Sequence, residues 1–60
     1  MPYKFVVKKD RKDEFRWTFV APNGEAMGTS GEGYTRKKSC LDAIESIKKN
    51  APGADIDDQT

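Results

Sequence analysis

The chain has 60 residues with a single cysteine, Cys40, and no histidine, so it can form no internal disulfide and has too few ligands for a Cys/His metal site. A domain of this size buries only about 60% of the surface that its unfolded chain exposes, which leaves a thin margin of stability. We therefore expect one domain spanning residues 1–60, stabilised by oligomerisation.

Charge is distributed unevenly along the chain. The first 50 residues carry 11 Lys and Arg against 7 Asp and Glu, a net charge of +4, whereas Asp55, Asp57 and Asp58 give the last ten residues a charge of −3. This asymmetry favours an anionic partner for the body of the domain, although an ordinary solvated surface explains it as well. No apolar run is long enough for a membrane span or the core of a signal peptide, which with the lone thiol predicts a cytoplasmic protein without a membrane partner.

Two segments near the N-terminus show the period-2 alternation of half-buried strands, residues 3–8 and residues 14–20. The polar stretch at residues 10–13 is rich in turn formers, so the chain should reverse there. One face of the second strand carries three aromatic side chains: Phe15, Trp17 and Phe19. They resemble a stacking platform for bases, but we favour their burial as core beneath a helix.

A tight hairpin is expected at Ala21–Glu25, because Pro22 pre-sets φ and Asn23-Gly24 readily adopts left-handed backbone. The third strand, residues 25–30, has weak strand propensity and must be held by its neighbours. Gly31 and Gly33 then indicate a loop whose backbone needs unusual dihedral angles.

Towards Asn50 the period becomes that of a helix, with an apolar stripe formed by Cys40, Ala43, Ile44, Ile47 and Ala51. Two starts compete, Thr35 as an N-cap or Ser39 in a capping box with Asp42, and we favour the earlier one. Residues 54–58 either form a short fourth strand around Ile56 or fray. The fold class is therefore α+β, a three-stranded antiparallel β-meander followed by one α-helix, β-β-β-α(-β).

The residues that carry a family resemblance run through nearly the whole chain. They are Phe5 to Val7, Phe15-Arg16-Trp17, Ala21-x-Asn23-Gly24-Glu25, Ser30-x-Glu32-Gly33-Tyr34, Ile44-Glu45-Ser46-Ile47-Lys48, Asn50-Ala51 and Ala54-x-Ile56-x-Asp58. As a set they resemble the YegP-like family of small bacterial domains. This resemblance implies β-β-β-α units that occur in tandem or as single copies associating in pairs, and hence a homodimer here. It brings no biochemical activity, catalytic residue or cofactor that can be carried over.

Two groups of basic residues are candidates for contacting an anion or a nucleic acid. Arg36, Lys37 and Lys38 stand at the start of the helix, where free backbone N–H groups favour a phosphate, although exposed lysines there are often merely solvated. The second group, Lys4, Lys8 and Arg16, would lie on the outer face of the sheet and could enter the major groove of DNA.

Catalytic chemistry lacks its usual components in this sequence. Cys40 lies on the apolar stripe with no histidine to activate it, so we expect a buried small hydrophobe. The acidic residues follow no spacing that forces a catalytic pair or a calcium loop. The expected function is a non-enzymatic, homodimeric interaction module without metal or cofactor, and the alternative is nucleic-acid or other anion binding through the basic residues.

Overall fold

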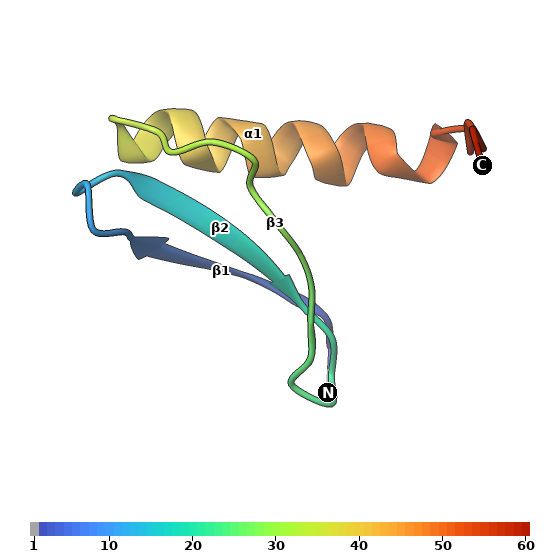
Figure 1. The fold of residues 1–60 in the computed structure, drawn as a ribbon, viewed down its shortest axis with the longest axis horizontal. Helices are drawn as coiled ribbons and strands as arrows, with labels where there is room; N and C mark the ends of the chain where they lie inside the picture. Colours follow the sequence, from blue (N-terminus) through green and yellow to red (C-terminus); the bar gives the residue numbers. More distant parts are fainter. Residues whose placement is uncertain (1) are drawn as a thin grey trace.

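The computed structural model describes residues 2–60 as one sheet and one helix (Figure 1). The elements in chain order are β1 (Lys4–Lys9), β2 (Phe15–Val20), β3 (Ala26–Thr29), α1 (Lys37–Asn50) and the 3₁₀ turn η1 (Ala51–Gly53). The strands pair antiparallel in the order β1-β2-β3. The α+β meander followed by a helix is confirmed, and each strand lies within one residue or so of its predicted range.

The register of the sheet gathers the aromatic residues on one face. Phe5 lies opposite Phe19, and Val7 lies opposite Trp17. The ring of Phe5 meets Trp17 edge-on, with 5.5 Å between centroids, and lies 4.8 Å from the ring of Phe19. Edge-on and tilted pairs of this kind are favourable beyond simple burial. The alternation in the sequence therefore produced the predicted aromatic face.

Both hairpin turns depend on a side chain that accepts backbone hydrogen bonds. In the first turn, Asp10 Oδ1 accepts from the N–H groups of Lys12 at 2.8 Å and Glu14 at 3.0 Å. In the second, Asn23 Oδ1 accepts from the N–H of Glu25 at 3.0 Å, and Gly24 has a φ of +89°. The predicted left-handed backbone is confirmed at Gly24, where a side chain would be strained.

The glycine loop before the helix works differently from the prediction. Among residues 2–60, Gly24 is the one glycine with positive φ, so the unusual dihedral angles expected at Gly31 and Gly33 are wrong. Gly33 is needed for space instead, because a β-carbon there would stand 2.8 Å from Cβ of Glu14. This close approach lets Tyr34 pair with Phe15 as an isolated bridge beyond β3, with N···O distances of 2.7 and 2.8 Å.

Because α1 begins at Lys37, the favoured N-cap at Thr35 is one residue too early, and the alternative start at Ser39 is wrong. The N-cap residue is Arg36, in an extended conformation, and no side chain within residues 2–60 caps it. The bridge at Tyr34 holds the chain extended up to this point, and Ser39 falls inside the first turn instead of before it. The predicted end at Asn50 is confirmed, with Lys48 and Lys49 in the last turn, where the helix dipole favours cations.

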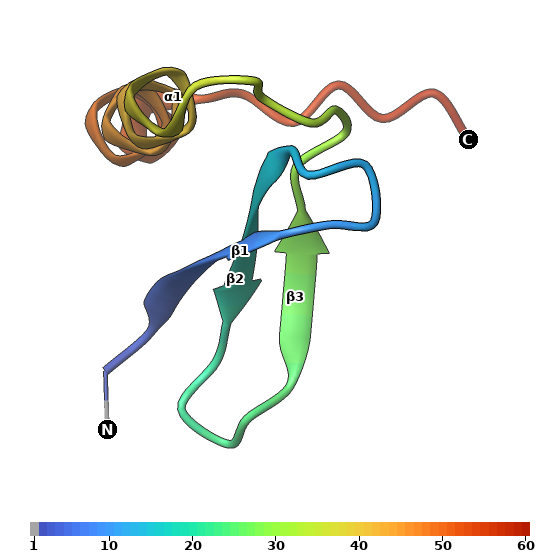
Figure 2. The same cartoon turned by 90° about the vertical axis from the view of Figure 1, so that its left-hand side faces the viewer.

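The C-terminal residues 54–60 are exposed and form no strand in the structure, so the fourth strand around Ile56 is wrong for the single chain. Figure 2, which looks along α1, shows this segment leaving the helix sideways. Ile56 is 93% exposed there. Its apolar side chain is not buried against any part of residues 2–60.

Candidate functional site

The helix covers only part of the aromatic face. The N-terminal half of α1 packs closely on the sheet, and there Cys40 and Ile44 are the buried apolar side chains of residues 2–60. Towards its C-terminal end the helix and the strands diverge (Figure 1). The aromatics predicted as covered core, Phe15, Trp17 and Phe19, are therefore only half-buried.

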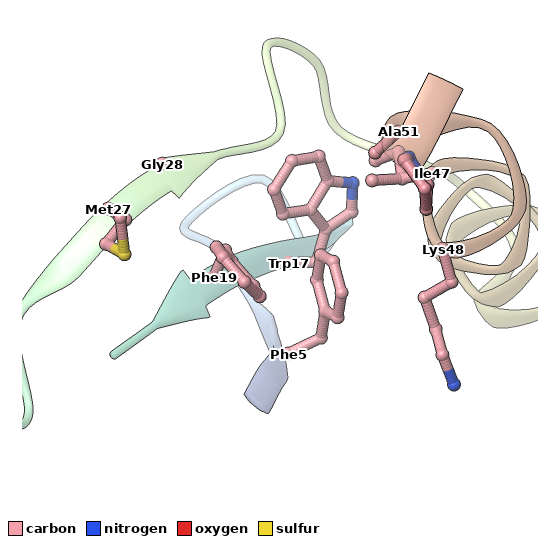
Figure 3. Close-up of a pocket in the computed structure, with 9 residues that line it drawn as sticks. Phe5, Trp17, Phe19, Met27, Gly28, Ile47, Lys48 and Ala51 are labelled. Carbon is pink, nitrogen blue, oxygen red and sulfur yellow. The ribbon is translucent and has the colours of Figure 1, made fainter. Parts of the chain in front are cut away.

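An apolar groove of about 540 Å³ lies between the C-terminal half of α1 and the strands, where the two diverge. Its floor is formed by Phe5, Trp17 and Phe19, and its walls include Met27 from β3 and Ile47 from α1 (Figure 3). The groove stays open because Gly28 stands opposite Phe19 and brings no side chain to cover it. Aromatic and methionine side chains are enriched at protein interfaces, so the residues that line this groove have the composition of an interface.

The floor of the groove contains an unsatisfied polar group. Trp17 Nε1 is buried and has no hydrogen-bond acceptor among residues 2–60. Figure 3 shows this nitrogen directed towards Ile47 and Ala51 of the helix end. Because an unpaired buried N–H costs about 1–3 kcal/mol, the contact between the helix end and the sheet is weaker than its apolar area implies.

A second apolar groove, of about 470 Å³, lies on the other flank of the helix. It contains Tyr3 and Leu41, which are 56% and 42% exposed. Lys48 lines both grooves at the helix end, and its Nζ lies 3.8 Å from Glu45 Oε1; Lys4 also lines the second groove. Apolar surface thus continues along both sides of α1.

The surface of the chain is large for its mass. The exposed area is 5189 Å², whereas a compact monomer of this mass exposes roughly 3,900 Å². The radius of gyration is 12.7 Å, compared with about 10 Å for a compact chain of this length. Each chain therefore exposes an excess of roughly 1,300 Å² over a compact monomer.

The basic cluster predicted at the helix start lies in solvent. Arg36, Lys37 and Lys38 are all exposed at the first turn of α1. Lys38 Nζ forms an ion pair with Asp42 Oδ2 at 3.3 Å, which gives Asp42 a partner other than the predicted cap. Exposed pairs of this kind contribute little to stability.

One member of the second basic group, Arg16, forms an ion pair with Asp10 that the sequence analysis did not predict. Lys4 and Lys8 are exposed on the sheet face opposite α1. Arg16 lies opposite Lys8, but its Nε donates to Asp10 Oδ2 at 2.6 Å and its Nη1 donates to the Ser30 carbonyl at 3.4 Å. The hydrogen bond from Arg16 lowers the pKa of Asp10, helped by the backbone N–H of Glu14. Asp10 begins the predicted turn and Arg16 lies in the strand that follows it, and this proximity is the signal that could have indicated the pair.

The thiol of Cys40 is wholly buried, as expected, and burial raises its pKa. Within residues 2–60 no three His, Cys, Asp or Glu side chains gather in a way that would hold a metal ion. No helix of that part of the chain has the length and apolarity needed to cross a membrane.

Known proteins resemble this chain over nearly its whole length. Residues 10–58 match the family model described as Domain of unknown function (DUF1508). A UPF0339 protein of Agrobacterium fabrum is 62% identical over 58 residues, which are 97% of this chain and 92% of that protein.

Two solved structures share the fold. The solution NMR structure of a protein from Haloferax volcanii has a TM-score of 0.86 and 43% identity, covering 93% of each chain. That of a protein from Agrobacterium tumefaciens has a TM-score of 0.76 and 47% identity, covering 93% of this chain and 89% of its own. The resemblance seen in the sequence to a small domain family without an assigned activity is confirmed, and the chain belongs to the DUF1508 family.

Proposed function

We propose that this protein is a small, non-enzymatic interaction module that works as a homodimer. The observation that carries the proposal is the open apolar groove between the aromatic face of the sheet and the C-terminal half of α1. A chain with two buried apolar side chains among its described residues has a small core, and a second copy would complete it.

The exposed surface area of the single chain is large enough for a dimer interface. A standard protein interface buries about 800 Å² on each partner. The excess of roughly 1,300 Å² on each chain exceeds this amount. Two grooves facing each other across a two-fold axis would form a self-complementary contact, in which each chain covers the aromatic floor of the other.

Analytical ultracentrifugation of the wild-type chain tests the proposal. We expect a species of about twice the 6.7 kDa chain mass at micromolar concentration. Circular dichroism on the same samples confirms that the chain is folded. A folded species that sediments as a monomer throughout the micromolar range would overturn the proposal.

Binding of an anion or a nucleic acid is the second candidate function. The observation that favours it is the outer face of the sheet, where Lys4 and Lys8 are exposed and uncovered by the helix. The pairing of Arg16 with Asp10 weakens this candidate, because it neutralises the central cation of that face. A titration with duplex DNA at low salt tests it, since phosphate contacts give an affinity that falls steeply with added salt. No binding at low salt would exclude it.

A further inference from the structure

The turn between β2 and β3 folds an asparagine side chain over its own backbone. Asn23 and Gly24 are exposed, at the end of the sheet that points away from α1 (Figure 2). Asn23 Oδ1 accepts from the N–H of Glu25 at 3.0 Å, so the carboxamide is directed forward along the chain, on the side of the Gly24 nitrogen. The same N–H stabilises negative charge on Oδ1, as an oxyanion-hole donor does when a nucleophile attacks a carbonyl carbon.

Gly24 supplies a nucleophile that is sterically open and held by one hydrogen bond. It has no side chain to crowd an approach of its nitrogen to Cγ of Asn23. Its N–H donates to the Ala21 carbonyl at 2.9 Å. Since the nitrogen must lose this proton before it can attack, the hydrogen bond restrains the reaction in the folded chain.

The second of the chain's two asparagines, Asn50, has the opposite arrangement. Its Nδ2 donates to the Ser46 carbonyl at 2.8 Å, which directs the carboxamide back along α1. The residue that follows is Ala51, whose N–H donates to the Ile47 carbonyl. Two hydrogen bonds must therefore open at Asn50 before the side chain can meet the next backbone nitrogen, and a methyl group crowds the approach.

We propose that Asn23 is a site of spontaneous deamidation in which the backbone nitrogen of Gly24 is the nucleophile. Hydroxide removes the Gly24 N–H proton, the nitrogen forms a bond to Cγ, and the bond from Cγ to Nδ2 breaks. The departing amide takes a proton from water and leaves as ammonia, which restores the hydroxide. Water then opens the succinimide ring at one of its two carbonyls, giving aspartate or isoaspartate. The net change is the replacement of ammonia by water.

The two products have different consequences for the turn. Aspartate keeps an acceptor oxygen at the place of Oδ1 and adds one negative charge. Isoaspartate carries the main chain through the side-chain carbon, so one further atom enters the backbone before Gly24. The turn is closed by the Gly24 N–H to the Ala21 carbonyl and by the Ala21 N–H to the Glu25 carbonyl. A longer backbone does not fit these bonds, so isoaspartate weakens the pairing of β2 with β3, the strand that carries Met27 to the groove.

Peptide mapping by mass spectrometry on the folded wild-type chain, incubated in mildly alkaline buffer, tests the site. Asn50 is the internal control, and the same chain unfolded in urea gives the unrestrained rate. We expect conversion at Asn23 to be at least about fivefold faster than at Asn50, because one hydrogen bond fewer must open. We expect it to be roughly 2- to 13-fold slower than in urea, the effect of the one hydrogen bond of Gly24.

Equal rates at the two asparagines of the folded chain would overturn the assignment of the site. The absence of conversion at Asn23 by the time that the unfolded chain is fully converted would do the same. A folded rate outside the expected range, including one equal to the rate in urea, would overturn the role given to the hydrogen bond of Gly24.

Asn23→Asp is the matched control for the effect on the turn, because it carries the new charge without the additional backbone atom. Ion-exchange chromatography separates the converted chains, and fragmentation by electron transfer distinguishes isoaspartate from aspartate. We expect the isoaspartate chain to unfold at a lower urea concentration than Asn23→Asp when both are measured at one protein concentration. Equal midpoints would overturn the weakening of the turn and leave the deamidation site standing.

Discussion

Met27→Asp is the sharpest test of the groove as a dimer interface. Met27 is 61% exposed in the single chain and lies in the wall of the groove. Fully burying a methionine side chain contributes about 1.5–3 kcal/mol, so covering the exposed fraction contributes about 1–2 kcal/mol per chain. Two-fold symmetry doubles this to about 2–4 kcal/mol, a factor of roughly 30 to 900 in the dissociation constant.

The desolvation of a carboxylate adds to that loss, so the estimate is a lower bound. Sedimentation velocity over a concentration series measures the dissociation constant, and circular dichroism checks that the variant folds. Thr29→Asp is the matched control, because Thr29 is exposed on the same strand and pairs with Thr18, away from the groove. A folded Met27→Asp chain that dimerises as tightly as Thr29→Asp would refute the assignment of the groove.

Three further predictions concern the fold, each measured at one fixed protein concentration because dimerisation couples to stability. Gly24→Ala should lower the unfolding free energy in urea by about 1–2 kcal/mol through its positive φ, whereas Gly31→Ala should not; equal effects would contradict the turn geometry. Cys40 should react slowly with a thiol reagent at neutral pH until urea unfolds the chain, because it is buried and its pKa is raised; rapid reaction in the folded state would contradict this. The lowered pKa of Asp10 means that its charge stabilises the fold above the ordinary carboxyl pKa and that this contribution disappears as pH falls through the lower folded value. The stability difference between wild type and Asp10→Asn should therefore shrink from pH 5 to pH 2, and a constant difference would show that the ion pair with Arg16 does not stabilise the fold.

Local pattern in the sequence was enough to predict the type and order of the elements. Alternation over residues 3–8 and 14–20 identified two strands, and the helical stripe that includes Cys40 and Ile44 identified both α1 and its buried side chains. The turn at Gly24 followed from residue chemistry alone. These features depend on neighbours in the chain, so the sequence contains the information directly.

The boundaries of the helix and the openness of the groove depend on contacts between distant residues. The pairing of Tyr34 with Phe15 delays the helix to Lys37, and no local cap signal reports it. The stripe of apolar residues shows which helix face turns inward, but not how closely that face approaches the sheet. That distance is decided by the crossing of the helix over a twisted sheet and by Gly28, which leaves Phe19 uncovered. The sequence by itself determined an aromatic face and a helix to lie on it, and only the tertiary structure decided that part of this face stays open.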